Sequence, residues 1–178
     1  MRVTISGPPG SGKTTVARAV AKALDLDLIL TGQVFRRQAK QAKMDVLKYN
    51  RLAEKDRSID EKLDDEIIRL AMASENVLVE GRLAGHLFMR KNISAFKVCV
   101  TALARVRAER IANRENTTAE REMEKLTNRE ISEKSRYLSF YGIDIEDMSV
   151  YDLVVDSSDL SANDAAEIVA TEIRKAQR

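Results

Sequence analysis

A glycine-rich segment near the N-terminus lies between a short apolar run and a segment suited to a helix. The sequence GPPGSGKT covers Gly7 to Thr14, directly after VTIS and before VARAVAKAL. Glycines at this spacing let the backbone curl so that successive N–H groups face one anion, and a following helix N-terminus adds positive potential. A chance glycine turn would give no reason for the adjacent lysine and threonine. The segment therefore predicts a P-loop that holds a nucleoside triphosphate.

Each residue type in this segment has an expected task. Lys13 would reach the β- and γ-phosphates, and the Thr14 hydroxyl would ligate Mg²⁺. Backbone N–H groups of the remaining residues would surround the phosphate oxygens. The candidate nucleotide-binding residues are Gly7, Pro8, Pro9, Gly10, Ser11, Gly12, Lys13, Thr14 and Thr15.

Short apolar runs alternate with longer helical segments along the chain. Strands are predicted at 3–6, 28–30, 77–80, 96–100 and 152–155, and helices at 13–24, 32–42, 45–55, 59–73, 103–115, 118–139 and 162–177. Hydroxyl-then-carboxylate spacing predicts helix starts at Thr117 and Ser161. Near-continuous apolar character suits strands covered on both faces. The alternation predicts an α/β fold with a parallel sheet, whose ligands bind beyond the carboxyl ends of the strands.

Composition limits the class of protein. With 178 residues and 44% hydrophobic content, the chain can bury one sizeable core, so we expect one domain over 1–178. The 30 basic and 28 acidic residues nearly balance, which gives no general argument for nucleic-acid or membrane binding. Cys99 is the only cysteine, so intramolecular disulfides are impossible and a reducing compartment is indicated. No apolar run approaches the ~20 residues that cross a bilayer, so we expect a cytoplasmic protein.

Polar residues follow the second and third predicted strands. Thr31 and Arg36 flank the first turns of a helix and can both address one anionic ligand, although Thr31 could instead cap the helix and Arg36 could be a surface charge. Glu80 ends the third strand, where P-loop proteins commonly place the acidic residue that orders Mg²⁺ or its waters. The alternative for Glu80 is a structural pair with Arg82. His86 has no companion residue and is interpreted as a packed or surface residue, not a base.

Two predicted helices carry arginines on one face. Arg107, Arg110 and Arg114 recur at helical spacing, which is costly unless anions lie opposite. Those anions could be neighbouring glutamates or a bound triphosphate. Further along the chain, a second face carries Arg129, Glu133 and Arg136.

These cations favour phosphoryl transfer over other uses of a P-loop. Transfer needs positive groups around the charge of the moving phosphate, and arginine offers a fixed fork of donors. The guanine-reading N-K-x-D segment of a GTPase switch is absent. A phosphate acceptor is already an oxyanion, so no strong general base is required.

Taken in chain order, these segments resemble the nucleoside monophosphate kinase family, and most closely the short archaeal-type cytidylate kinases. The resemblance is carried by ISGPPGSGKTTVA, T-G-x-x-F-R, VLVEGRLAG, the R-x-x-x-R of residues 110–114, NREISEKSRY, YGID and YDLVVDSS. EGRLAG and the pair YGID and YDLVVDSS are more specific signals than the P-loop. The resemblance implies a P-loop NTPase fold of five parallel strands with two mobile parts.

The resemblance also implies roles for individual residues. Residues 32–73 would form the helices that bind the monophosphate, and 107–136 the lid over ATP. The acceptor-binding residues would be Thr31, Arg36, Arg82, Arg129, Glu133 and Arg136. Mg²⁺ would be held by Thr14 and Glu80, the latter directly or through water. The catalytic residues would be Lys13, Arg110, Arg114 and Arg129. Arg110 would lie over the adenine and Arg114 near the phosphates. The loop after YDLVVDSS would border the adenine.

The implied reaction is Mg²⁺-dependent, in-line transfer of the γ-phosphoryl of ATP to CMP or dCMP. Larger bacterial cytidylate kinases carry an aspartate where this chain has Leu83, and an inserted subdomain that it lacks, so no cytosine contact is carried over. Another acceptor, AMP or UMP, and an ATP-dependent switch protein remain as alternatives. We expect small-molecule nucleotides as partners of a monomer, with no nucleic acid and no membrane.

Overall fold

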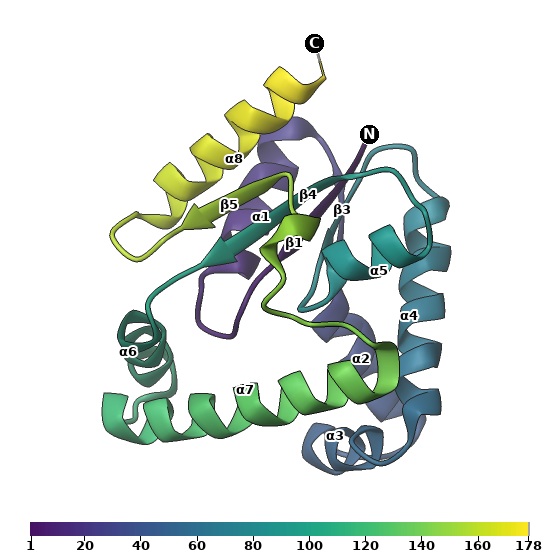
Figure 1. Ribbon diagram of the computed structural model, residues 1–178, viewed down its shortest axis with the longest axis vertical. Helices are drawn as coiled ribbons and strands as arrows, with labels where there is room; N and C mark the ends of the chain where they lie inside the picture. Colours follow the sequence, from purple (N-terminus) through teal and green to yellow (C-terminus); the bar gives the residue numbers. More distant parts are fainter. Residues whose placement is uncertain (178) are drawn as a thin grey trace.

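A computed structural model describes residues 1–177, so Arg178, the last residue of the expected domain, lies outside the described part. Five strands form one sheet (Figure 1). They are β1 Arg2–Ser6, β2 Asp27–Leu30, β3 Val77–Glu80, β4 Phe96–Thr101 and β5 Leu153–Asp156. The strand order is β2-β3-β1-β4-β5, and every neighbouring pair is parallel. The predicted α/β class with a parallel sheet is confirmed.

The predicted helices are found with shifts of a few residues at their ends. They are α1 Lys13–Leu24, α2 Thr31–Gln41, α3 Val46–Ala53, α4 Arg57–Met72, α6 Ala104–Glu115, α7 Ala119–Tyr141 and α8 Ala162–Ala176. Two short helices were not predicted: α5, Ala84–Arg90, and the 3₁₀ helix η1, Met148–Val150. Five consecutive residues of α5, from Ala84 to Phe88, are buried. A helix whose first five residues are all buried lacks the one-sided apolar pattern on which helix prediction relies.

Helix capping was predicted correctly at one of two positions. Ser161 caps α8, because its hydroxyl accepts from the Asp164 N–H at 3.1 Å. The cap of α7 is Thr118 and not Thr117. The Thr117 hydroxyl instead donates to Glu122 at 2.9 Å. Both threonines carry a hydroxyl that could cap the helix. The backbone conformation at the turn decides which of the two acts as the cap.

Two apolar layers cover the two faces of the sheet. On one face, α1 and α8 pack against β1, β4 and β5 through Val16, Val20, Val169 and Ile173. On the other face, α2, α4 and α5 pack through residues that include Ile67 and Phe88. Strand β3 contributes Leu78 to the first layer and Val77 and Val79 to the second, as alternating side chains of a strand must.

Beyond the carboxyl ends of the strands, α7 runs along the lower edge of the molecule from α6 to the ends of α3 and α4 (Figure 1). The loop between β1 and α1 descends from the sheet toward this helix (Figure 1). The long helix α7 therefore spans the whole edge at which ligands of a parallel sheet bind. Among residues 1–177, no helix combines the length and the apolar character that spanning a bilayer requires.

The buried side of α5 can be tested with two adjacent residues. Phe88 is fully buried, whereas Met89 is 46% exposed. We expect Phe88→Ala to lower the free energy of unfolding by about 3–5 kcal/mol, because it leaves a cavity in the core. Met89→Ala should change it by less than about 0.5 kcal/mol. Urea denaturation measures both, and equal effects of the two substitutions would contradict the placement of α5.

Candidate active site

The P-loop leaves a set of backbone donors exposed at the start of α1. Gly12 precedes the helix in the left-handed conformation, with φ 82°, and makes no side-chain cap bond. The first N–H groups of a helix have no partners within it, so here they are available to an anion. Gly10 supports this shape because a Cβ there would lie 2.8 Å from the Arg107 carbonyl oxygen. The predicted phosphate-binding geometry is therefore present in the backbone.

Lys13 and Glu80 face each other beside this loop. Their Nζ and Oε1 atoms are 3.9 Å apart, and Lys13 also donates to the Pro8 carbonyl at 3.3 Å. Burial lowers the pKa of Lys13, and Glu80 opposes this effect. Burial raises the pKa of Glu80, while Lys13 and a hydrogen bond from Thr14 lower it. Lys13, Thr14 and Glu80 are therefore brought together as predicted, and the alternative pair of Glu80 with Arg82 does not form.

Glu133 joins α7 to the turn that follows β3. Its Oε2 accepts from Arg82 Nε at 2.8 Å, and its Oε1 accepts from Arg129 Nε at 2.7 Å. Burial raises the pKa of Glu133, but Arg129 and Arg82 lower it more, so the pKa lies below its ordinary value. Arg82, Arg129 and Glu133 all act electrostatically on Lys13. Three predicted acceptor-site residues thus gather next to the P-loop lysine.

Thr31 and Arg36 lie in the first turns of α2, at the edge of the sheet where the strands end. The N-cap of α2 is Leu30 and not Thr31, so the capping alternative for Thr31 is not what the fold uses. Thr31 instead packs on Gly81, where a Cβ would lie 2.3 Å from Thr31 Oγ1. Arg36 is exposed, and its charge is one of those that lower the pKa of Glu80. Arg36 therefore lies within electrostatic reach of Glu80.

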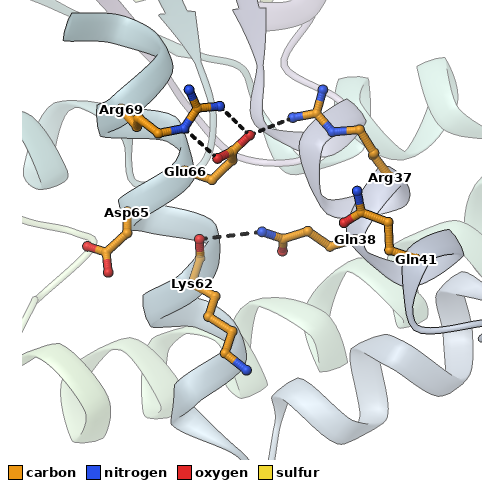
Figure 2. A pocket seen from close by; sticks show the side chains of 7 residues that line it. All are labelled: Arg37, Gln38, Gln41, Lys62, Asp65, Glu66 and Arg69. Atoms are coloured by element: carbon orange, nitrogen blue, oxygen red, sulfur yellow. Dashed lines mark hydrogen bonds and ion pairs between the residues drawn. The ribbon is translucent and has the colours of Figure 1, made fainter.

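The neighbouring Arg37 has different surroundings. Figure 2 shows a surface groove between α2 and α4, in which Glu66 bridges Arg37 and Arg69. The Arg37 side chain is 52% exposed, so Arg37 is a largely solvated charge. The two consecutive arginines of α2 therefore have different neighbours. Arg36 lies within electrostatic reach of Glu80, and Arg37 binds Glu66 of α4.

The three arginines on one face of α6 differ in their surroundings. Arg107 is buried, donates to the Ala102 and Pro9 carbonyls, and pairs with Glu130 of α7 at 2.5 Å. Arg110 donates to Ser157, with distances of 3.0 Å to Oγ and 2.6 Å to the carbonyl oxygen. It lies next to Gly12 of the P-loop. Arg107 therefore supports the loop, and Arg110 lies beside it.

The structure does not bring Arg114 to the phosphate cradle. Its side chain is 68% exposed and its Nε donates to the adjacent Glu115 at 2.8 Å. This arrangement matches the alternative in which neighbouring glutamates neutralise the helix. A role of Arg114 near the phosphates stays a prediction.

Two residues near the site were not identified from the sequence. Ser157, buried directly after β5, lies 2.9 Å from the Ser11 carbonyl and 3.0 Å from that of Thr101. Its position at a strand end was the available signal. Asp60 of α4 pairs with Arg136 at 3.7 Å, so Arg136 turns toward α4 and not toward Glu133. No sequence pattern indicated this pair, because the two residues are far apart in the chain.

His86 is packed, as one of its interpretations held. It is 3% exposed, and its Nδ1 lies 3.3 Å from the Tyr151 hydroxyl. Burial lowers its pKa. Its surroundings therefore give it a structural task within α5.

A phosphate cradle follows the central strand, with a half-buried lysine beside it and arginines from α2, the turn after β3 and α7 around it. These features define the class of protein: this is a P-loop kinase. Solved structures agree on the fold. A shikimate kinase from Bacteroides thetaiotaomicron has a TM-score of 0.64 at 15% identity, covering 99% of this chain and 98% of its own. One from Acinetobacter baumannii has a TM-score of 0.63 at 12% identity, covering 98% and 93%. At these identities the likeness concerns the fold alone.

Sequence comparison identifies the family. The model of the cytidylate kinase-like family matches residues 2–159, and the chain belongs to that family. A cytidylate kinase of Sulfolobus acidocaldarius is 40% identical over 169 residues, which is 95% of this chain and 92% of the relative. The cytidylate kinase of Methanocaldococcus jannaschii is 38% identical over 174 residues, 97% of each chain. The resemblance found from the motifs is therefore confirmed.

Acid should remove the stabilisation that Glu133 provides. Since the pKa of Glu133 is lowered in the folded state, its contribution is present above its unfolded pKa of about 4.3 and is lost as pH falls through the folded value. We expect Glu133→Gln to reduce the free energy of unfolding by about 1–3 kcal/mol at neutral pH. The difference from the unsubstituted protein should shrink as pH falls below the unfolded pKa of about 4.3. Urea titrations across this range measure it, and a pH-independent difference would refute the assignment.

Proposed function

We propose that this protein transfers the γ-phosphoryl group of ATP to CMP or dCMP, forming ADP and CDP or dCDP. The observation that carries the proposal is the convergence of two charged sets on Lys13. One is the P-loop with Glu80, and the other is Arg82 and Arg129 held by Glu133. Relatives named cytidylate kinase align with nearly the whole chain and support CMP as the acceptor. We also propose that the protein acts as a cytoplasmic monomer on small-molecule nucleotides.

On the donor side, the N–H groups at the start of α1 bind the phosphates of ATP, and Lys13 reaches the β- and γ-phosphates. The Thr14 hydroxyl and the Glu80 carboxylate lie together and offer the oxygen ligands that Mg²⁺ requires. When bound, this ion neutralises charge on the β- and γ-phosphates. Arg110, beside Gly12 and Ser157, covers the nucleotide from α6. Burial is the main cause of the lowered pKa of Lys13, and Arg82 and Arg129 add to it; anionic phosphates would offset the positive charge of these two arginines.

On the acceptor side, Thr31 and Arg36 hold the monophosphate from α2, and Arg82 and Arg129 hold it from the opposite side. Guanidinium groups stabilise the charge spread over the transferred phosphate because they are fixed before the reaction starts. The acceptor oxygen already carries negative charge, so no residue must remove a proton. The packed state of His86 is consistent with such a mechanism.

Two segments are proposed to move during the reaction. Residues 32–73 carry the acceptor-binding helices α2 to α4, and residues 107–136 form the lid over ATP. Closure of the lid would exclude water and so prevent hydrolysis of ATP without an acceptor. The ion pair between Arg82 and Glu133 links α7 to the turn after β3 and would fix the closed arrangement.

The first test is ADP release from ATP and Mg²⁺ with CMP, dCMP, UMP, AMP, GMP or no acceptor. We expect strong release with CMP and dCMP, and a loss of at least about 10³-fold in Lys13→Ala, because Lys13 stabilises charge that develops in the transition state. Lys22→Ala, at the far end of α1, is the control and should retain full activity. Release that is equal without an acceptor would indicate an ATPase, and preference for AMP or UMP another monophosphate kinase.

Two neighbouring arginines test the acceptor site. Arg36→Ala should raise the KM for CMP about 10- to 100-fold and leave the KM for ATP unchanged, since a charged hydrogen bond to the acceptor is lost. Arg37→Ala is the matched control, because Arg37 pairs with Glu66 on the surface and should leave both constants unchanged. Steady-state kinetics with each substrate varied in turn provide the measurement. If Arg36→Ala impaired ATP binding instead, Thr31 and Arg36 would not form an acceptor site.

A further inference from the structure

Two oppositely charged side chains meet between α4 and α7 without satisfying each other. The Asp60 side chain is 8% exposed and that of Arg136 is 15% exposed, and Arg136 Nε lies 3.7 Å from Asp60 Oδ2. Among the described residues, neither of these two buried atoms has a hydrogen-bond partner. Buried charged groups are normally hydrogen-bonded, so this pair has an unused acceptor and an unused donor side by side.

Aromatic side chains surround the pair. The Arg136 guanidinium lies over the Tyr137 ring, 5.1 Å from its centroid, and donates to the Tyr137 hydroxyl at 3.3 Å. Burial raises the pKa of Tyr49, and Asp56 and Asp60 add to this shift, which places Tyr49 within the electrostatic reach of Asp60. The Tyr49 ring in turn packs against Phe35 at 5.1 Å between centroids. A charged donor and acceptor framed by aromatic rings suit a flat heteroaromatic ligand.

The pair lies at a fitting distance from the phosphate groups. Arg129 and Arg136 are separated by two turns of α7, about 10 Å along the helix axis. Arg129, in the middle of α7, acts on Lys13, while Arg136, two turns nearer the C-terminal end of α7, lies beside Asp60 of α4. Figure 1 shows α4 next to that end of α7. A ribose bridges such a distance between the phosphate and the base of one nucleotide. Arg36, which faces the phosphate end, is adjacent to Phe35, which packs on Tyr49 near the pair.

We propose that Asp60 and Arg136 read the cytosine base of the acceptor, an inference that rests on the function proposed above. The Asp60 carboxylate accepts a hydrogen bond from the exocyclic N4 amino group, and the Arg136 guanidinium donates to N3 and O2. Acidic side chains accept from cytosine N4 in other recognition sites, and arginine presents its donors as a planar fork. The base supplies the hydrogen-bond partners that the Asp60 and Arg136 side chains do not give each other.

This arrangement discriminates among bases through charge and donor pattern. Uracil presents an acceptor, O4, toward the Asp60 carboxylate and a donor, N3–H, toward Arg136, so both contacts become repulsive. Adenine, like cytosine, has an amino donor (N6) beside a ring-nitrogen acceptor (N1), but it carries a C–H group where cytosine carries O2. Leaving a buried donor or acceptor unpaired is costly, so a site built this way rejects the wrong base strongly. The pair of Asp60 and Arg136 thus supplies the contact to the cytosine base that the sequence motifs did not identify.

The test compares Asp60→Asn with Asp64→Asn by measuring kcat/KM for CMP and for UMP. Asparagine can donate to uracil O4, so Asp60→Asn should lower the ratio of CMP to UMP about 10- to 100-fold and leave the KM for ATP unchanged. Asp64 is the matched control. It lies one turn further along α4, burial raises its pKa to about 6, and it hydrogen-bonds with Tyr141 and not with Arg136. Asp64→Asn should keep the ratio.

A second variant covers the case in which Asp60→Asn folds poorly. Arg136→Lys keeps the charge but loses the fork, and we expect it to raise the KM for CMP about tenfold and lower the ratio of CMP to UMP. The thermal midpoint of each variant separates loss of fold from loss of selectivity. Folded variants that keep the ratio, or an Asp64→Asn variant that changes it equally, would overturn the inference. Failure of the proposed function is distinct, since the unsubstituted protein would then not phosphorylate CMP.

Discussion

The structure depends on keeping a curled backbone loop in place at the end of its central strand. The loop is not held by its own hydrogen bonds alone, because its N–H groups at the start of α1 must stay available. Its neighbours hold it instead. Val100 of β4 approaches Gly7 so closely that a Cβ there would lie 2.0 Å from the Val100 carbonyl oxygen. Arg107 binds the Pro9 carbonyl, and Ser157 the Ser11 carbonyl. The phosphate cradle is therefore held in shape by contacts from β4, α6 and the end of β5.

Ion pairs also hold α7 in place, and three of them join it to α6, the turn after β3 and α4. Arg107 binds Glu130, Arg82 binds Glu133, and Asp60 lies beside Arg136. Buried ion pairs contribute little net stability because desolvation offsets their attraction, but they impose geometry. These contacts set the charged groups of α7 against α6, the turn after β3, and α4 in turn. In the proposed function, a single long helix thereby aligns the donor side, the transfer site and the acceptor side.

Sequence reasoning succeeded where the signal was local. The alternation of apolar runs located all five strands to within one or two residues, and the P-loop spacing located the loop between β1 and α1. It failed where the outcome depended on contacts distant in the chain. The buried helix α5 showed no periodicity, and Thr118 replaced Thr117 as the cap of α7. Arg107, Arg110 and Arg114 look equivalent along a helix face, yet one is buried, one contacts Ser157 and one is at the surface.

The sequence by itself determined the fold class, the phosphate cradle and the family, because each follows from residue types at short, fixed spacing. The tertiary structure alone decided which charges meet. Glu80 faces Lys13, Glu133 bridges Arg82 and Arg129, and Asp60 lies beside Arg136. The physical reason is that the strength of an ion pair depends on distance and burial in space. The chain sets those two quantities only when the sheet brings the ends of separate strands to one edge and lays α7 across it.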